Sequence, residues 1–329
     1  MCFEFRSIAL ALLAALAPTA ASAQQGSLIA VSNEAAHTIT LVDPHSLRVV
    51  KTIAVPQRPR GIEFSPDGKT LYVALSDTLK HVKGSGDAIV AIDPARPRIT
   101  AILPAGSDPE RFAITPDGKR MYAANEDGSS ASATDIATRK IVASLVVGIE
   151  PEGVAVSPDG RWVYVTAETS NSVSVIDARS NRVVANFLVD VRPRAVVFSP
   201  DGSRAYVTAE IGGSLTVVDT RTRNIITTIP LERRQGKPVG VVVSPDGKWV
   251  YVANGNAGAV SIIDATRNVV AGRVAVGKRP WGIAVSPDGR TVYTADGLSD
   301  QLSVIDVPSR RVRATVKVGH QPWGVAVSP

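Results

Sequence analysis

Short apolar segments separated by a recurring four-residue turn dominate the pattern of this chain. The clearest copy contains the apolar segment Gly153–Val156, the turn Ser157-Pro158-Asp159-Gly160 and a second segment with Tyr164-Val165. Proline presets φ at the first corner, aspartate can bond its own backbone, and glycine takes the positive φ that a bulged hairpin needs. The turn recurs at residues 65–68, 115–118, 199–202, 244–247 and 286–289, and a clipped copy, Ser328-Pro329, ends the chain. A turn returning every 40 to 50 residues predicts a repeat architecture.

The spacing of aspartates defines the repeating unit. In five copies 18 residues separate the turn aspartate from the aspartate that closes the third strand, as from Asp159 to Asp177. The next turn aspartate follows 24 residues later, and only two intervals are longer, Asp67 to Asp93 and Asp219 to Asp246. Each unit predicts four short strands rich in Val, Ile, Thr and Tyr. One copy has them at residues 282–285, 292–295, 302–305 and 312–318.

The two ends of the chain each supply part of one unit. The N-terminal part contains only strands two to four, which start near Leu28, Thr38 and Val49, and the C-terminal part adds the missing first strand, Trp323 to Val327. In a ring the two incomplete units meet and form one complete sheet, so no strand edge is left open. In a linear stack they would lie at opposite ends and could not pair. The sequence therefore predicts an all-β, seven-bladed β-propeller of four-stranded antiparallel blades, closed by pairing the N-terminal strands with the C-terminal strand.

The first 23 residues are expected to form a signal peptide, followed by one propeller domain over residues 24–329. Arg6 gives a weakly positive start, residues 8–17 form an apolar run, and Ala21-Ser22-Ala23 fits a cleavage site. The only cysteine, Cys2, lies in the removed segment, so no cysteine-based metal site is expected. We expect a periplasmic or secreted protein with no membrane span after cleavage.

The formal net charge of +6 at pH 7 allows two interpretations. A basic balance favours an anionic partner, while scattered Lys and Arg on a solvated surface would give the same number. No basic run with interleaved aromatic residues occurs, so a nucleic-acid partner is not expected.

Both irregular intervals fall on the same face of the predicted ring. Strands alternate in direction, so the Pro-Asp-Gly turns share one face and the second-to-third and fourth-to-first loops share the other. The longer loop, Asp77 to Asp87, and the extra residues around Arg233 to Lys237 both belong to the second face. Loops on a rigid scaffold often carry function, so a site is expected on this variable face.

A ring of unlike residues is predicted at the mouth of the central channel. The residue after the proline that opens each innermost strand should point there: Arg60, Glu110, Glu152, Arg194, Val239, Trp281 and Trp323, with His320 close by. Arginines and an aromatic wall could hold a small polar or anionic ligand or a partner protein. Alternatively, Arg60, Arg194 and the glutamates pair with one another and seal the channel.

Signatures of catalysis and metal binding are weak in this sequence. Neither HExxH, a cysteine pair, a Gly-x-Ser-x-Gly elbow nor a phosphate-binding loop before a helix occurs. Glu110 and Glu152 could form an acid/base pair, yet nothing in the sequence indicates a tuned pKa. We therefore assign no catalytic residue and no metal site, and expect no tightly held cofactor.

The repeats resemble those of the bacterial YVTN β-propeller family. The resemblance is carried by Tyr164-Val165-Thr166-Ala167, Tyr206-Val207-Thr208-Ala209 and Tyr251-Val252-Ala253-Asn254. Within that family the chain looks most similar to the PQQ-dependent catabolism-associated β-propeller proteins, through strings such as Arg58-Pro59-Arg60-Gly61 and Glu150-Pro151-Glu152-Gly153. The resemblance implies an association with periplasmic quinoprotein oxidation of alcohols.

Three functions remain open from the sequence. The preferred hypothesis is a non-catalytic propeller that binds a ligand or a partner such as a periplasmic quinoprotein dehydrogenase or a cytochrome. The second is a propeller enzyme, either a lactonase-like hydrolase or a subunit like the amine dehydrogenase heavy chain. The third is an envelope or surface-layer interaction module.

Overall fold

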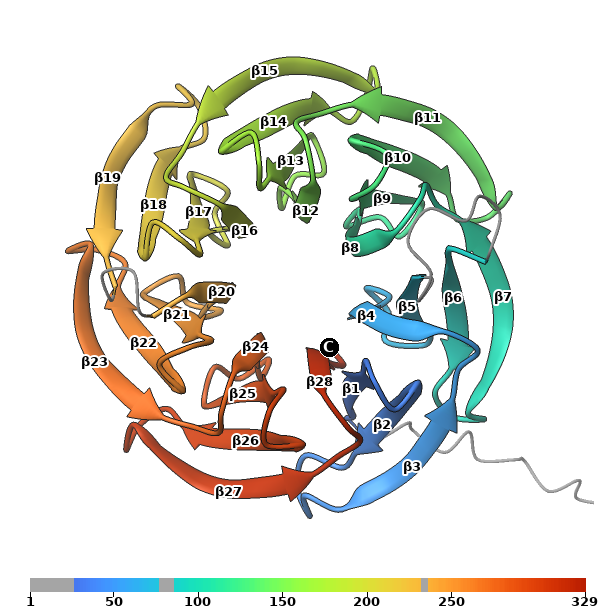
Figure 1. Ribbon diagram of the computed structural model, residues 1–329, viewed down its shortest axis with the longest axis vertical. Helices are drawn as coiled ribbons and strands as arrows, with labels where there is room; N and C mark the ends of the chain where they lie inside the picture. Colours follow the sequence, from blue (N-terminus) through green and yellow to red (C-terminus); the bar gives the residue numbers. More distant parts are fainter. Residues whose placement is uncertain (1–26, 77–85, 232–235) are drawn as a thin grey trace, which may run out of the picture.

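The computed structural model describes residues 27–76, 86–231 and 236–329, and every regular element in these ranges is a β-strand. Twenty-eight strands form seven four-stranded antiparallel sheets around a central channel (Figure 1). The predicted seven-bladed β-propeller is therefore confirmed.

Each blade runs from an innermost strand at the channel to an outermost strand at the rim. The closing blade contains β28 (Pro322–Val327), β1 (Ile29–Asn33), β2 (Thr38–Val42) and β3 (Val49–Ala54). Blade 1 contains β4 (Arg58–Phe64), β5 (Leu71–Ser76), β6 (Ala88–Asp93) and β7 (Arg98–Pro104). Blade 2 contains β8 (Pro109–Ile114), β9 (Arg120–Asn125), β10 (Ser130–Asp135) and β11 (Lys140–Val146). Blade 3 contains β12 (Pro151–Val156), β13 (Trp162–Ala167), β14 (Ser172–Asp177) and β15 (Arg182–Leu188). Blade 4 contains β16 (Pro193–Phe198), β17 (Arg204–Ala209), β18 (Ser214–Asp219) and β19 (Ile225–Pro230). Blade 5 contains β20 (Pro238–Val243), β21 (Trp249–Asn254), β22 (Ala259–Asp264) and β23 (Val269–Ala275). Blade 6 contains β24 (Pro280–Val285), β25 (Thr291–Asp296), β26 (Gln301–Asp306) and β27 (Arg311–Lys317).

The ring is closed by the pairing that the sequence predicted. β28 lies antiparallel to β1, with Val325 opposite Val31. At the end of this pair, the backbone N–H of Leu28 donates to Oγ of Ser328 over 2.9 Å. Pro329 packs against Gly68, as the turn prolines of other blades pack against the turn glycine of the following blade. Pro329 therefore holds the same place at the seam as the turn proline does in the other blades.

The core lies between neighbouring blades rather than inside any one sheet. Most residues of the second and third strands of each blade are buried, because both faces of these strands pack against adjacent blades. The outermost strands alternate between exposed and partly buried residues, as β15 does. Hydrophobic residues in these strands thus face either a neighbouring blade or solvent, and the stacked blades form one rigid ring.

Adjacent innermost strands approach each other closely through small residues and hydroxyl bridges. A Cβ atom placed on Gly282 would lie 2.5 Å from the carbonyl oxygen of Trp323 in the next blade. In the closing blade, Oγ of Ser32 donates to the carbonyl of Arg60 over 2.6 Å and accepts from the N–H of Gly324 over 2.9 Å. These contacts fix the distance of each blade from the channel axis.

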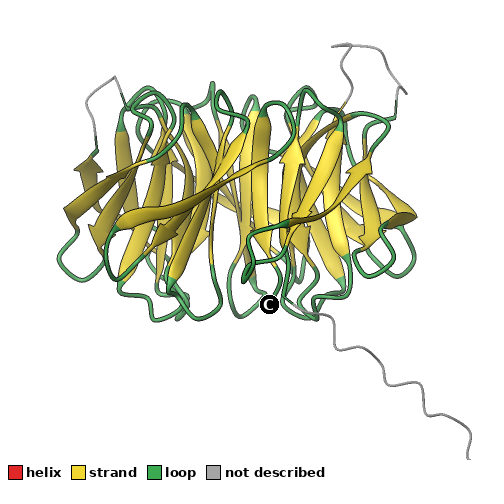
Figure 2. Cartoon of the chain, turned by 90° about the horizontal axis from the view of Figure 1, so that it is seen from below, coloured by secondary structure: helices red, strands yellow, loops and turns green. Residues whose placement is uncertain are grey.

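The strands run between two faces of the disc, and Figure 2 shows the C-terminus at one of them. The Pro-Asp-Gly turns form that face, and the channel mouth opens at the other. The predicted signal peptide, most of the Asp77 to Asp87 loop and residues 232–235 lie outside the described residues. In the part of the chain that is described, no helix is long and apolar enough to cross a membrane.

Candidate functional site

A cavity of about 470 Å³ occupies the mouth of the channel on the variable face. The innermost strands reach this mouth at their first residues, a proline followed by the side chain that the sequence predicted to face the channel. The cavity is lined by Glu34, Arg58, Arg60, Glu126, Glu152, Arg192, Arg194, Arg279, Trp281, Gly297, Leu298, Gln321, Pro322 and Trp323. Five arginines and three glutamates are among them, so the lining is strongly charged and offers guanidinium donors to an anionic or strongly polar ligand.

The backbone at this mouth is strained in a repeated manner. In six blades the residue before the first proline of the innermost strand adopts a left-handed conformation, with φ between 48° and 62°. These residues are Asp108, Glu150, Arg192, Lys237, Arg279 and Gln321. Non-glycine residues take this conformation only where the surrounding structure holds them there, and such residues cluster at functional sites. Three of these six residues, Arg192, Arg279 and Gln321, line the cavity.

The first arginine pair of the mouth, Arg58 and Arg60, is neutralised by carboxylates of the closing blade and of blade 2. Nη1 of Arg58 and Nε of Arg60 each lie 3.3 Å from the same oxygen of Glu34. Arg58 also lies 3.2 Å from Asp108, and Arg60 pairs with the fully buried Glu110. The ion pairs that the sequence offered as the alternative to ligand binding are therefore present on this side of the mouth.

The equivalent pair in blade 4, Arg192 and Arg194, forms a second network. Nε of Arg192 lies 2.6 Å from Glu168, and Arg194 also pairs with Glu168. Nη2 of Arg194 lies 3.2 Å from Oε1 of Glu152, whose side chain is 2% exposed. Glu210 lies 3.2 Å from Arg192 and 3.6 Å from Lys237. Unlike Glu110, Glu152 lines the cavity, so its carboxylate is held by a cation and still faces the ligand space.

Trp281 and Trp323 form an aromatic wall on the side of the mouth opposite blades 2 and 3, which carry Glu110 and Glu152. The rings of Trp281 and Trp323 lie 6.2 Å apart at an interplanar angle of 40°. The guanidinium groups of Arg194 and Arg279 lie 4.9 and 4.6 Å from the centroid of Trp281, within cation–π range. The Nε1 donor of Trp281 is buried and has no hydrogen-bond partner among the described residues. It is available to an acceptor that enters the cavity.

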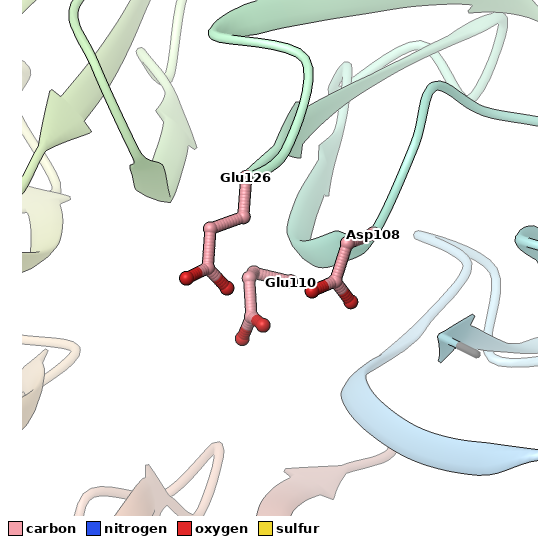
Figure 3. A group of neighbouring side chains, drawn as sticks. All are labelled: Asp108, Glu110 and Glu126. Atoms are coloured by element: carbon pink, nitrogen blue, oxygen red, sulfur yellow. The ribbon is translucent and has the colours of Figure 1, made fainter. Parts of the chain in front are cut away.

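Three neighbouring carboxylates form the group best placed to hold a cation. Figure 3 shows Asp108, Glu110 and Glu126 together at the mouth end of blade 2, and one oxygen of each lies within 4.8 Å of the others. Arg58 and Arg60 already compensate Asp108 and Glu110, so two of the three charges are balanced by the protein itself. The expectation of no metal at this site stays a prediction.

Six of the seven predicted site residues lie together around the channel, and one lies apart. Arg60, Glu152, Arg194, Trp281 and Trp323 line the cavity, and Glu110 lies directly behind Arg60. His320 is exposed, with Nδ1 3.0 Å from Asp300, and does not line the cavity. Ligand or partner binding by these residues stays a prediction.

Two charged channel residues escaped the sequence analysis. Arg111 follows Glu110 at a position where five other blades have glycine and one has alanine. Glu63 occupies a position where the other blades have alanine or valine, and burial raises its pKa to about 8. Aligning the blades residue by residue would have revealed both, because each replaces a small residue of the repeat by a charged one.

Two family models match the sequence. The choice-of-anchor I domain model matches residues 17–187, just over half of the chain. The model of the lactonase, 7-bladed β-propeller, matches residues 184–327. No curated protein sequence matches the chain.

Several solved structures have the same fold. Hydrazine synthase of Kuenenia stuttgartiensis is 26% identical, with a TM-score of 0.76, covering 84% of this chain and 92% of that one. The periplasmic gluconolactonase PpgL of Pseudomonas aeruginosa is 22% identical, with a TM-score of 0.77, covering 92% and 99%. A candidate 6-phosphogluconolactonase of Bacteroides fragilis is 18% identical, with a TM-score of 0.76, covering 94% and 99%.

These comparisons correct the function preferred from the sequence. A non-catalytic propeller accessory to PQQ-dependent alcohol catabolism was expected, but the lactonase model matches the C-terminal blades and two similar structures carry lactonase names. The lactonase-like alternative fits these findings better. The sequence did not favour this alternative, because it contains no short catalytic motif and the residues at the mouth come from different blades. The chain belongs to the choice-of-anchor I domain family, and its fold is that of the lactonase-type seven-bladed β-propellers.

Proposed function

We propose that this protein is a hydrolase that opens lactones in the cavity at the channel mouth. The observation that carries the proposal is Glu152, a nearly buried carboxylate that lines an arginine-rich cavity and is held by Arg194 over 3.2 Å. The match to the lactonase model and the lactonase names of two similar structures support the same reaction class. A carboxylate beside fixed cations in a cavity has the composition that ester hydrolysis needs.

In the proposed reaction Glu152 acts as the general base. It takes a proton from a water molecule, and the water oxygen attacks the carbonyl carbon of the lactone. Arg60 and Arg194 stabilise the negative charge that develops on the carbonyl oxygen, because their guanidinium groups already point to the mouth. The ring C–O bond then breaks, the released ring oxygen takes up the proton, and the product is a hydroxy acid.

The neighbouring side chains would position the substrate. Trp281 and Trp323 offer flat surfaces and the unpaired Nε1 donor of Trp281, which suit a cyclic ligand with oxygen acceptors. Arg279 is exposed at the rim and forms no ion pair with any described residue, so it is available to a ligand that enters the cavity. The newly formed carboxylate of the product would meet the same arginines.

Hydrolysis of lactones in a pH-stat tests this function. The purified chain is assayed at pH 7 with glucono-δ-lactone and γ-butyrolactone, and the spontaneous rate measured without protein is subtracted. Glu152→Gln should lower kcat by about 10²- to 10⁴-fold, the usual contribution of a general base. Glu150→Gln is the matched control, because Glu150 lies two positions away, is exposed and does not line the cavity.

Two results would refute the proposal. One is a wild-type rate equal to the blank with every lactone. The other is a Glu152→Gln variant that hydrolyses a lactone as fast as the wild type and the Glu150→Gln control.

Two expectations from the sequence, the export of the chain and its resemblance to the YVTN family, also stay proposals. We propose that residues 1–23 direct the protein out of the cytoplasm and are cleaved. N-terminal sequencing of the protein recovered from the periplasmic fraction of a bacterial host should begin at Gln24, and recovery of the uncleaved chain in the cytoplasm would contradict this.

A further inference from the structure

Arg111 breaks the repeat at the innermost strands. It lies on β8, one position after Glu110, and the equivalent residues of the other blades are Gly61, Gly153, Ala195, Gly240, Gly282 and Gly324. Five of these are glycines whose position a Cβ would crowd against the backbone of the following blade. The fold therefore favours a glycine at this position, and a long cationic side chain here needs a separate explanation.

The side chain of Arg111 extends from blade 2 toward the closing blade. Its Cζ atom lies 4.6 Å from the ring centroid of Trp323, although blade 1 separates the two blades in the ring. The guanidinium Nε and Nη2 atoms are shielded from solvent, and neither has a hydrogen-bond partner among the described residues. Arg111 also forms no ion pair within the described ranges, so two strong donors inside the channel have no acceptor from the protein.

The carboxylates around Arg111 are paired with other arginines. Arg60 pairs with Glu110 and Glu34, and Arg194 pairs with Glu152 and Glu168. None of these four carboxylates forms an ion pair with Arg111. Burial lowers the pKa of Arg111 to about 10, Glu152 opposes this shift, and Arg194 and Arg60 reinforce it. The group is still protonated at neutral pH, and a buried charge without a partner is costly.

We propose that the central channel binds a small monovalent anion against the guanidinium of Arg111, beside Trp323. The anion accepts hydrogen bonds from Nε and Nη2, which have no acceptor among the described residues. This site does not depend on the proposed lactone hydrolysis, because Arg111 does not line the mouth cavity. The same chemistry suits a free inorganic anion or the carboxylate of an organic acid that reaches the channel from the mouth.

Bromide tests the site directly, because it is a monovalent anion and scatters X-rays anomalously. Crystals of the full chain soaked in sodium bromide should show an anomalous peak within hydrogen-bond distance of Nε or Nη2 of Arg111. In solution, sodium bromide should raise Tm saturably, by roughly 4 °C at a hundredfold excess over Kd, relative to sodium MES at equal ionic strength.

Three variants separate binding from general salt effects. Arg111→Met removes the charge and keeps much of the length, and Arg111→Gly installs the residue that five blades already use, so at least one of them is expected to fold. Both should lose the bromide-dependent rise in Tm and the anomalous peak. Arg161→Met is the matched control, because Arg161 lies 4.5 Å over Trp162 outside the channel, and it should respond to bromide as the wild type does.

The source of the anion is decided by competition. If sodium gluconate removes the bromide peak, the site accepts organic carboxylates; if the peak persists, it accepts small inorganic anions only. The proposal is overturned if no bromide lies near Arg111, or if the Arg111 variants keep the full bromide-dependent rise in Tm.

Discussion

Nη2 of Arg194 lies 3.2 Å from Oε1 of Glu152 at the channel mouth. The same guanidinium lies 4.9 Å from the ring centroid of Trp281 on the opposite side of the mouth. Arg194 thus contacts both Glu152 of blade 3 and Trp281 of the aromatic wall. Blade 5 lies between them, and its residue at this position, Val239, is short enough to let the arginine pass.

Replacing Arg194 by methionine should destabilise the fold strongly. The substitution would leave Glu152 and Glu168 buried without their shared cation, and removing one partner of a buried pair costs about 3 to 5 kcal/mol. Urea unfolding followed by circular dichroism would measure the loss. Lys119→Met is the control, because Lys119 is 79% exposed and 3.9 Å from Asp117, and it should change the free energy by less than about 0.5 kcal/mol. Equal effects of the two substitutions would contradict this account of the mouth.

Glu63 should make the protein less stable as the pH rises from about 4.5 to about 8. Burial raises its pKa to about 8, and the N–H of Ile114, 3.5 Å away, opposes the shift only weakly. Below pH about 4.5 the folded and unfolded chains both hold the proton. Between that pH and about 8 the unfolded chain releases it first, so the free energy of unfolding falls as the pH rises.

A Glu63→Gln variant tests this dependence. It should be more stable than the wild type at pH 8.5 by roughly 2 to 5 kcal/mol, and should differ much less at pH 4.5. Urea unfolding at the two pH values gives both numbers. A stability difference that is the same at the two pH values would show that the carboxyl group does not titrate in this range.

Gly282→Ala should weaken the contact between blade 6 and the closing blade. The new Cβ would lie 2.5 Å from the carbonyl oxygen of Trp323 and 2.9 Å from Cα of Gly324, and backbone atoms cannot move aside as a flexible side chain can. Overpacking of this kind costs about 1 to 3 kcal/mol. At Gly272 the nearest atom is Nη1 of Arg310, 3.2 Å away at the end of a long side chain, so Gly272→Ala should cost much less than Gly282→Ala. Differential scanning calorimetry of both variants gives their Tm values. A lower Tm for Gly272→Ala than for Gly282→Ala would contradict this prediction.

Removing residues 322–329 should prevent the ring from closing. β1 would lose its partner strand β28 and the N–H bond of Leu28 to Ser328, and the apolar cluster around Val31 and Val325 would be exposed. We expect an aggregated or largely unfolded chain in size-exclusion chromatography. A circular permutant that joins residue 329 to residue 27 and opens at the turn between β14 and β15 keeps all these contacts and should remain monomeric. If the truncated chain folds as well as the permutant, the seam does not stabilise the ring.

The sequence predicted the ring because its evidence is local and repeated. A Pro-Asp-Gly turn at a nearly constant interval specifies a hairpin in six blades, and the incomplete units at Leu28 and Trp323 have one way to complete each other. The sequence also placed Arg60, Glu152 and Trp281 at the mouth, because each follows the proline that opens an innermost strand.

The pairing and the chemistry of the site were harder to predict. Arg60 pairs with Glu110 of the next blade, whereas Arg194 pairs with Glu152 of the preceding one, and only the packed ring decides which carboxylate each arginine reaches. His320 is close to the mouth in sequence but turns toward Asp300. Whether a buried carboxylate serves stability or hydrolysis depends on its access to a cavity, which no sequence spacing encodes.

The seam between β28 and β1 has a practical consequence for handling the protein. Leu28 and Ser328 are hydrogen-bonded neighbours, and Pro329 packs against the turn containing Gly68, on the side of the disc away from the cavity. An affinity tag, a fluorophore or a sensor chip coupled at residue 329 would therefore hold the molecule with its opening toward the solution. Every copy immobilised in this way would present Trp281 and Arg279 to an approaching ligand in the same orientation.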